Sequence, residues 1–316
     1  MNANQYDVII LGGGPAGLTA GIYLSRAKSH VLILDTGTPG GQMILTYEIA
    51  NYPGFENITG YQLSSNMAKQ AKSFGCNIQS NVKIANINFG KESHKITLEN
   101  GTTFKTPALI LATGGRPRML NVPGETEFKG RGISYCSTCD GDFFQDKEIV
   151  VVGGGNSALE EAVSLTKYAS KVTILHEFDH FQAFEQAVKE AKEHPKIQCI
   201  MESHITGFYG DESLRKIRYK NLKTGDENEL KIDGAFIFIG YEANTDAFKN
   251  SDIKLNQWNE IVTDEKLQTN IPGVFAAGDC RAKQYRQITT AVADGTVAAL
   301  NAMNYIREKK TTVVSK

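Results

Sequence analysis

The sequence predicts an α/β fold with two doubly wound domains of the dinucleotide-binding type. Two segments support this prediction, because each has the pattern of a strand, a glycine-rich turn, a helix and a second strand. The first is YDVIILGGGPAGLTAGIYLSRA, which begins at Tyr6 and is followed by the apolar run from His30 to Leu34. The second is KEIVVVGGGNSALEEAVSLTKYASKVTIL, from Lys147 to Leu175. Each β-α-β unit forms the centre of one parallel sheet, so two units imply two domains.

Two later stretches extend this pattern. GAFIFIGYEANT, which starts at Gly234, predicts a buried strand that ends in a loop. IPGVFAAGDCRAKQYRQITTAVADGTVAALNAMNYI predicts a strand, a loop and a long helix with small residues on one face. We expect the tail, REKKTTVVSK, to be a frayed terminus.

Length and composition define the broad class of the protein. The chain has 316 residues, enough for two domains, with 41% hydrophobic and 22% charged residues. The formal net charge of −1 gives no sign of binding to nucleic acid or to an anionic membrane. No apolar run is long enough to span a bilayer, and the start, MNANQYDVII, lacks the basic region of a signal peptide. Three of the five cysteines, Cys76, Cys199 and Cys280, stand alone, unlike a secreted disulfide framework, so we expect a cytoplasmic protein.

The first glycine cluster has the spacing of a dinucleotide-binding loop. Gly12, Gly14 and Gly17 form G-x-G-x-x-G between a predicted strand and a predicted helix. This spacing permits a tight turn, close approach of the backbone to a pyrophosphate and close packing of the helix, whose N-terminus faces the phosphate charge. Asp35 ends the second strand, where a carboxylate accepts from a ribose hydroxyl or caps a turn. We therefore predict a dinucleotide site here.

Six motifs along the chain resemble those of one known family. TPGGQM, NYPG, LATGG, YCSTCDG, GGGNSA and AAGDCRAKQYRQITTA occur in the order and spacing of the low-molecular-weight thioredoxin reductases, and the resemblance covers nearly the whole chain. It implies that the first site holds FAD. It also implies that the second domain is inserted in the first: residues 1–117 and 246–316 form a split FAD-binding domain. Residues 118–245 form a pyridine-nucleotide-type domain that carries a redox cysteine pair.

The resemblance also implies which residues contact the cofactor. The expected FAD contacts are Gly12, Gly14, Pro15, Ala16, Gly17, Asp35, Gly41, Gln42, Asn51, Val82, Thr113, Gly114, Gly278, Asp279, Arg286, Gln287 and Ile288. Asp279 at a strand end is suited to ribityl hydroxyls, and Gln287 or its backbone amide is suited to the flavin ring. Arg286 and Gln287 also fit a solvated loop.

Cys136 and Cys139 form a C-x-x-C motif, followed by Asp140. Zinc needs four ligands, and the other cysteines are scattered while His176 and His180 form an isolated pair, so we predict no metal site. A redox disulfide fits better, because this spacing closes a small reducible ring and lowers the pKa of one thiol. Asp140 is placed to relay the proton of each exchange, or to cap a helix.

The resemblance assigns a role to each cysteine. Cys139 would face the flavin and take its electrons, whereas Cys136 would attack the disulfide of thioredoxin, the expected substrate. Cys139 would then resolve the mixed disulfide. The family also implies a homodimer.

The second glycine loop, G-x-G-x-x-A at Gly153, Gly155 and Ala158, precedes an altered recognition segment. NADPH-using members carry H-R-R at the strand end and a third arginine one turn later, but this chain has Glu177, Phe178 and Gln182 at those positions. A charge-assisted hydrogen bond contributes roughly 1.5–3 kcal/mol. Losing two or three of them would weaken recognition of a 2′-phosphate on the order of a thousandfold or more. We therefore expect this nucleotide site to be degenerate and NADPH to be a poor donor.

Two interpretations of the second nucleotide site remain, and each implies a different electron donor. Glu177 could bind a ribose diol, which would make the enzyme NADH-dependent. Alternatively the chain resembles the ferredoxin-dependent flavin thioredoxin reductases, which lack the arginine motif. We favour ferredoxin over the alternative donors, which are NADH and, behind it, NADPH or a deazaflavin. A ferredoxin near −400 mV and a thioredoxin near −270 mV differ by about 130 mV, roughly 6 kcal/mol for two electrons. A flavin reductase without dithiol chemistry and a non-enzymatic flavoprotein are the alternatives from other classes, and Cys136 and Cys139 argue against the first.

Overall fold

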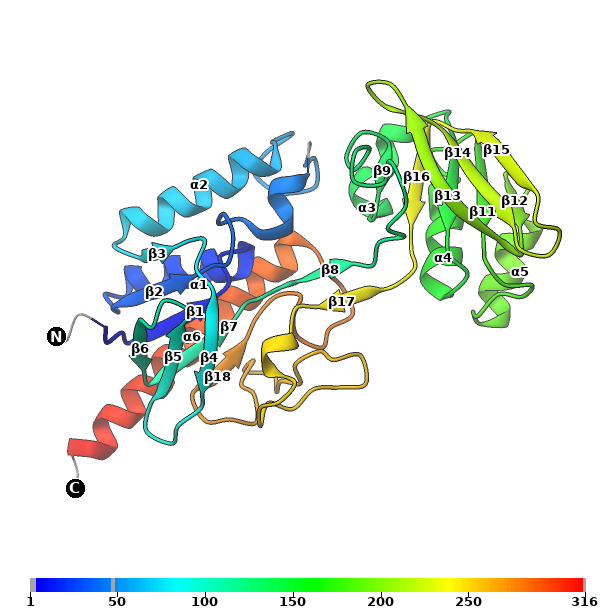
Figure 1. The fold of residues 1–316 in the computed structure, drawn as a ribbon. Coiled ribbons are helices and arrows are strands. Elements are labelled where there is room, and N and C mark those ends of the chain that lie inside the picture. Colours follow the sequence, from blue (N-terminus) through cyan, green and yellow to red (C-terminus); the bar gives the residue numbers. More distant parts are fainter. Residues whose placement is uncertain (1–3, 47–48, 315–316) are drawn as a thin grey trace. The chain divides into compact units, whose positions relative to one another are not determined.

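The computed structural model describes residues 4–46 and 49–314 (Figure 1). The first three residues of MNANQYDVII, the segment in which we expect no signal peptide, lie outside the described residues. The chain forms two compact units. The first consists of Met1–Arg116 and Glu242–Lys316, and the second of Pro117–Tyr241. The chain passes between them along a two-stranded ribbon of β8 (Gly115–Pro117) and β17 (Tyr241–Ala243).

The first unit is built on a five-stranded parallel sheet with the order β18-β7-β1-β2-β3. Its strands are β18 (Val274–Ala276), β7 (Ala108–Leu111), β1 (Val8–Leu11), β2 (Val31–Leu34) and β3 (Asn77–Gln79). Every residue of β1, β2 and β7 is buried, as expected for parallel strands covered on both faces.

Two different layers cover this sheet. Helices α1 (Pro15–Arg26), α2 (Gly60–Ser73) and α6 (Ile288–Val314) share one core with one face. Strands β4 (Ile84–Asn88), β5 (His94–Leu98) and β6 (Thr103–Thr106) form an antiparallel sheet that shares a second core with the other face. Short 3-10 helices η1 (Gly41–Leu45) and η3 (Asp246–Phe248) lie in its connections.

Helix α6 packs closely on α1 and is longer than expected. A Cβ atom added at Gly295 would lie 2.2 Å from the carbonyl oxygen of Ala16, so a side chain there would separate the helices. The expectation of a frayed tail is wrong for most of that segment, because α6 continues to Val314. Lys309 donates to the carbonyl oxygen of Glu92 at 2.5 Å and so connects the end of the helix to the loop that precedes β5.

The second unit repeats this plan. Its parallel sheet has the order β12-β11-β10-β16-β9, with strands β12 (Ile197–Ile200), β11 (Lys171–Leu175), β10 (Glu148–Val152), β16 (Gly234–Ile237) and β9 (Ile133–Ser134). Helices α4 (Asn156–Leu165) and α5 (Glu185–Glu193) share a core with one face. Antiparallel strands β13 (Ser203–Gly210), β14 (Leu214–Asn221) and β15 (Glu227–Lys231) cover the other. The predicted α/β fold with two parallel-sheet units is confirmed.

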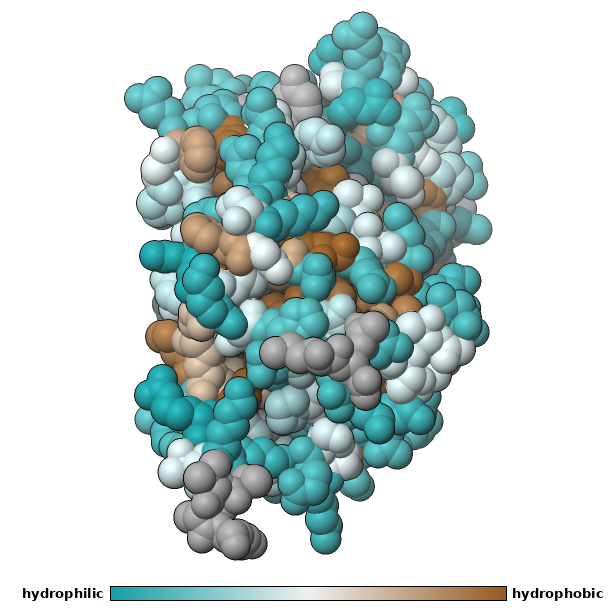
Figure 2. Space-filling view, turned by 90° about the vertical axis from the view of Figure 1, so that its left-hand side faces the viewer, coloured by the Kyte–Doolittle hydropathy of each residue, from teal (hydrophilic) through white to brown (hydrophobic). Residues whose placement is uncertain are grey.

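The described helices include none with the length and hydropathy of a membrane span. On the face shown in Figure 2, hydrophobic residues are interspersed with hydrophilic ones. Exposed apolar residues scattered in this way are normal on protein surfaces, so this face alone identifies no site.

Candidate redox and nucleotide sites

The redox motif lies in the second unit, just after strand β9. Cys136 is the N-cap of the short helix α3 (Ser137–Asp140), which is followed by η2 (Gly141–Phe144). One helical turn brings Cys139 back over Cys136, and the two form a disulfide with their Cα atoms 5.3 Å apart. The N–H of Cys139 points at the Cys136 sulfur, 3.2 Å away, where it would stabilise a thiolate. The predicted redox disulfide is confirmed.

Asp140 lies beside the disulfide and is tied to the strand that precedes it. The hydroxyl of Ser134, at the end of β9, donates to Asp140 Oδ2 at 2.5 Å. Burial raises the pKa of Asp140, Asp142 raises it further, and the hydrogen bond from Ser134 acts in the opposite direction. A carboxyl group with a raised pKa is suited to carry a proton near neutral pH. The helix-capping alternative is not realised, because the Asp140 side chain makes no capping bond to η2.

A buried carboxylate that sequence reasoning missed holds the residue before Cys136. Glu125 is 1% exposed and accepts hydrogen bonds from the backbone N–H groups of Leu120 (2.9 Å) and Asn121 (2.6 Å). It also accepts from the hydroxyl of Tyr135 at 2.8 Å. Burial and the Glu125 carboxylate raise the pKa of Tyr135 far above its ordinary value. The Cys136 segment is thereby fixed to the chain that enters the second unit.

The α3 turn is also fixed to the neighbouring helix. The hydroxyl of Ser137 donates to Glu161 of α4 in a short hydrogen bond. The chain order around C-S-T-C gives no sign of this partner, since the two residues are 24 positions apart.

The predicted first dinucleotide loop lies at the carboxyl ends of β1, β2, β7 and β18. Gly12 has φ +105°, and a Cβ atom there would lie 2.2 Å from the carbonyl oxygen of Ala112. Gly14, the N-cap of α1, faces Gly41, and the N–H of Gly40 donates to the Gly13 carbonyl oxygen at 2.7 Å. Backbone without side chains at the N-terminus of α1 is the arrangement that a pyrophosphate needs, so these residues fit FAD.

Asp35 is held by backbone groups of this loop. Its carboxylate accepts from the N–H of Gly13 at 2.5 Å and of Gly37 at 2.7 Å, and its carbonyl oxygen accepts from the N–H of Val82 at 3.0 Å. Asp35 therefore shapes the loop, as in the turn-capping alternative, and its contact with a ribose hydroxyl stays a prediction.

The other predicted FAD positions lie in three kinds of place. The structure brings Thr113, Gly114 and Gly278 to the same sheet edge, where the hydroxyl of Thr113 donates to the Asn244 carbonyl oxygen at 2.7 Å and a Cβ atom on Gly278 would lie 3.0 Å from the Cβ of Ala16. Gln42 and Asn51, in contrast, are exposed. Pro15, Ala16 and Ile288 lie at the starts of α1 and α6.

The late loop contains an ionic cluster that sequence reasoning also missed. Asp294 of α6 accepts from the N–H of Gly278 (3.0 Å), from Arg281 (3.0 Å) and from Lys283 (2.8 Å), all largely buried. The predicted contact Arg286 pairs with Glu260. These ion pairs hold the loop that carries the expected contacts Asp279 and Gln287. The N–H of Gln287 donates to the Thr290 hydroxyl at 3.1 Å, and the flavin contact of Gln287 stays a prediction.

In the second glycine loop, the segment after β11 lies directly over the glycines. A Cβ atom on Gly154 would lie 2.4 Å from the ring of His176. The N–H of Gln182 donates to the Gly154 carbonyl oxygen at 2.8 Å, and that of Phe184 donates to the Asn156 side chain at 2.7 Å. The backbone of the dinucleotide-type loop is thus retained, and hydrogen bonds from the following segment hold it in place.

The side chains that would recognise a 2′-phosphate are absent from the described edge of this loop. The His176 ring contacts the rings of Phe178 (5.3 Å between centroids) and Phe181 (5.6 Å), and burial lowers the pKa of His176, which disfavours its cationic form. Glu177, Phe178 and Gln182 are exposed, with Phe178 at 43%. This surface offers a carboxylate and a phenyl ring where a phosphate needs cations.

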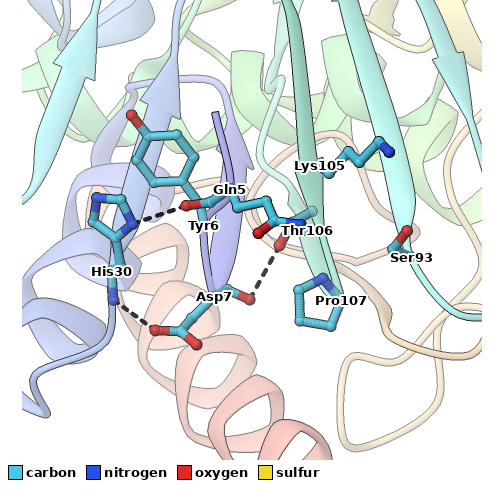
Figure 3. A pocket seen from close by; sticks show the side chains of 8 residues that line it. All are labelled: Gln5, Tyr6, Asp7, His30, Ser93, Lys105, Thr106 and Pro107. Atoms are coloured by element: carbon cyan, nitrogen blue, oxygen red, sulfur yellow. Dashed lines mark hydrogen bonds between the residues drawn. The ribbon is translucent and has the colours of Figure 1, made fainter. Parts of the chain in front are cut away.

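A separate hollow of about 350 Å³ lies at the opposite ends of β1 and β7 (Figure 3). Its polar groups bond mainly to one another: the His30 ring contacts the Gln5 carbonyl oxygen, and the His30 N–H donates to Asp7, both at 2.9 Å. Ligands of doubly wound sheets bind at the carboxyl ends of the strands, so this hollow is not the dinucleotide site.

The chain is similar to known proteins over nearly its whole length. The model of the pyridine nucleotide-disulphide oxidoreductase family matches residues 6–295. Thioredoxin reductase of Listeria monocytogenes is 44% identical over 306 residues, which cover 96% of this chain and 95% of that protein. A protein of Clostridium pasteurianum described as a 34.2 kDa protein in rubredoxin operon is 47% identical over 305 residues, covering 96% and 98%. The solved thioredoxin reductase from Streptococcus pyogenes superimposes with a TM-score of 0.93 at 37% identity, covering 96% and 99%.

Proposed function

This chain belongs to the pyridine nucleotide-disulphide oxidoreductase family, and we propose that it reduces thioredoxin with electrons from ferredoxin. It is a flavoprotein disulfide reductase of the thioredoxin reductase type, and FAD is its cofactor.

The observation that carries the donor proposal is the surface beside the second glycine loop. Phosphate recognition depends on charge-assisted hydrogen bonds from arginine or lysine. Here Glu177 would repel a 2′-phosphate and Phe178 offers no hydrogen bond. The His176 ring is packed on Gly154, and burial lowers its pKa. A nucleotide loop without its recognition groups favours a donor that is not NADPH.

A ferredoxin meets the energetic requirement for such a donor. Its reduction potential lies below that of thioredoxin, so the transfer of electrons to thioredoxin is favourable. When bound, FAD would supply the change from single-electron to two-electron chemistry. A low-potential ferredoxin is therefore a suitable donor for this chain.

The cysteine pair then carries out the exchange with thioredoxin. Two electrons and two protons convert the Cys136–Cys139 disulfide to two thiols. Cys136, as a thiolate supported by the Cys139 N–H, attacks one sulfur of the thioredoxin disulfide, and the other sulfur leaves and takes up a proton. Cys139 attacks the Cys136 sulfur of the mixed disulfide, which releases reduced thioredoxin and restores the enzyme disulfide. Asp140 holds and donates the proton that the leaving sulfur needs.

Location and assembly are part of the same proposal. Cys76, Cys199 and Cys280 are free thiols, which suits the reducing cytoplasm. We expect a homodimer.

A second donor has one observation in its favour. Glu177 follows the end of β11 and is exposed, which is where an acidic residue binds the ribose of NADH. NADH is therefore the competitor that the test must separate from ferredoxin.

The test is anaerobic reduction of the purified flavoprotein in separate cuvettes with NADPH, NADH and reduced ferredoxin, followed by flavin absorbance. We expect rapid bleaching with ferredoxin alone and reoxidation after thioredoxin is added. The Cys136→Ser variant is the matched control, because it should be bleached by ferredoxin but not reoxidised by thioredoxin. Rapid bleaching by NADH would overturn the proposal that ferredoxin is the donor. The absence of thioredoxin-dependent reoxidation would overturn the proposal that thioredoxin is the substrate.

A further inference from the structure

A single buried hydroxyl connects the acid and the attacking cysteine of the redox site. Ser134 is 4% exposed. Its Oγ lies 2.5 Å from Asp140 Oδ2, 3.0 Å from the N–H of Cys136 and 3.2 Å from the carbonyl oxygen of Cys136. All of these contacts lie within the second unit.

The hydrogen-bonding capacity of a hydroxyl matches both forms of the acid. A serine hydroxyl has one proton to donate and two lone pairs. While Asp140 is ionised, Ser134 donates to it and accepts from the Cys136 N–H. When Asp140 gains a proton, that O–H can donate to Ser134, and the Ser134 proton turns to the Cys136 carbonyl oxygen. No buried polar group loses its partner in either state, which would otherwise cost about 1–3 kcal/mol.

We propose that Ser134 is a positioning residue that keeps the Asp140 carboxyl bonded in both protonation states while it fixes the Cys136 backbone. This inference rests on the proposed function, because it gives Asp140 a proton to carry in disulfide exchange. Reduction of the enzyme disulfide brings two electrons and two protons; while Cys136 is the thiolate, one proton lies on Cys139 and the other on Asp140. Asp140 gives its proton to the first thioredoxin sulfur that leaves, takes the Cys139 proton as that thiol attacks the mixed disulfide, and passes it to the second leaving sulfur. Asp140 is then ionised until the next reduction.

The charges around Asp140 explain why a neutral donor is useful there. The charge of Asp142 in η2 raises the pKa of Asp140, and Glu161 of α4 accepts the hydrogen bond from Ser137. Burial and Asp142 both disfavour the carboxylate, whereas the Ser134 hydroxyl stabilises it. Without that hydroxyl the pKa of Asp140 would rise further.

The test follows the thiols directly and needs neither ferredoxin nor thioredoxin. The FAD-loaded enzyme is reduced with dithiothreitol, freed of reductant without oxygen, and alkylated with iodoacetamide from pH 5 to 9. Mass spectrometry gives the rate at Cys136. Because neighbouring groups titrate together, ionisation of Asp140 should appear as a separate lower step in this profile.

Three variants give distinct expected results. Ser134→Ala should move the lower step up by about one pH unit, a tenfold change in the ionisation constant. Ser134→Thr keeps the hydroxyl and should leave the step in place, while Asp140→Asn should remove it. Ser203→Ala is the matched control, since it deletes another buried hydroxyl of this unit, bonded to the Met201 carbonyl oxygen at 3.0 Å.

Several results would overturn the inference. These are an unchanged step in folded Ser134→Ala, or a step that persists in Asp140→Asn. If Ser134→Ala does not fold, Ser134→Cys decides, since a weaker donor must also raise the step. Failure of dithiothreitol to open the wild-type disulfide would overturn the proposed function and this inference together, whereas failure of ferredoxin as donor would leave the inference intact.

Discussion

Restoring cations beside the second glycine loop should create an NADPH site. The change is Glu177→Arg, Phe178→Arg and Gln182→Arg in one variant. All three side chains are exposed, so the substitutions should each alter the free energy of unfolding by no more than about 0.5 kcal/mol. Three charge-assisted hydrogen bonds at about 1.5 kcal/mol each give roughly 4.5 kcal/mol, the lower end of their range. That corresponds to about a thousandfold gain in the NADPH-to-NADH affinity ratio.

Isothermal calorimetry with NADPH and NADH, at fixed and low salt, measures this ratio without turnover. The matched control is Glu177→Gln with Phe178→Gln, which removes the repulsion and the phenyl ring but adds no cation. We expect it to gain far less than the arginine variant. The reasoning is refuted if the wild-type protein already binds NADPH much more tightly than NADH. It is equally refuted if the folded arginine variant prefers NADPH no more than the glutamine variant does.

Three further predictions test other parts of the structure. Cys139→Ser should accumulate a covalent Cys136–thioredoxin complex visible by mass spectrometry, whereas Cys136→Ser should not; the opposite result would exchange the two roles. Burial and the charge of Lys309 lower the pKa of His94 to about 4. The unfolded chain therefore binds a proton at this histidine more readily than the folded protein does, and the free energy of unfolding should fall by about 3 kcal/mol between pH 6.5 and pH 4. His94→Gln should flatten that part of the melting temperature profile, and an unchanged slope would contradict the shift. Asp294→Asn leaves two buried cations without their carboxylate, so urea unfolding should show a loss of about 3–5 kcal/mol, and a loss below 1 kcal/mol would show that the late loop does not depend on it.

Local patterns made the frame of the protein predictable. Gly12 lies between a predicted apolar strand and a predicted helix. A tight turn between these two elements needs glycine, so the glycine loop could be recognised from the sequence. Cys136 and Cys139 are one helical turn apart, so their pairing follows from spacing and elimination of zinc. The loss of the arginines can also be recognised from the sequence, because it requires only the residue types at two positions, Glu177 and Phe178.

Contacts between distant segments were beyond sequence reasoning. Glu125 looks like an ordinary surface residue in the chain, and only burial against Tyr135 and two backbone N–H groups shows its role. The same is true of Asp294, whose partners come from another loop. The end of α6 was expected to fray, because its ties to Glu92 lie more than two hundred residues away in the sequence.

The sequence by itself therefore determined the two doubly wound units, the redox pair and the lack of arginine in the segment His176–Gln182 that follows β11, since each depends on residues close together in the chain. Only the tertiary structure decided which polar groups support them: Ser134 on Asp140, Glu125 on Tyr135 and Asp294 on the late loop. The physical reason is that a polar side chain acquires its role from burial and from the partner it meets, and neither is encoded in the neighbouring residues.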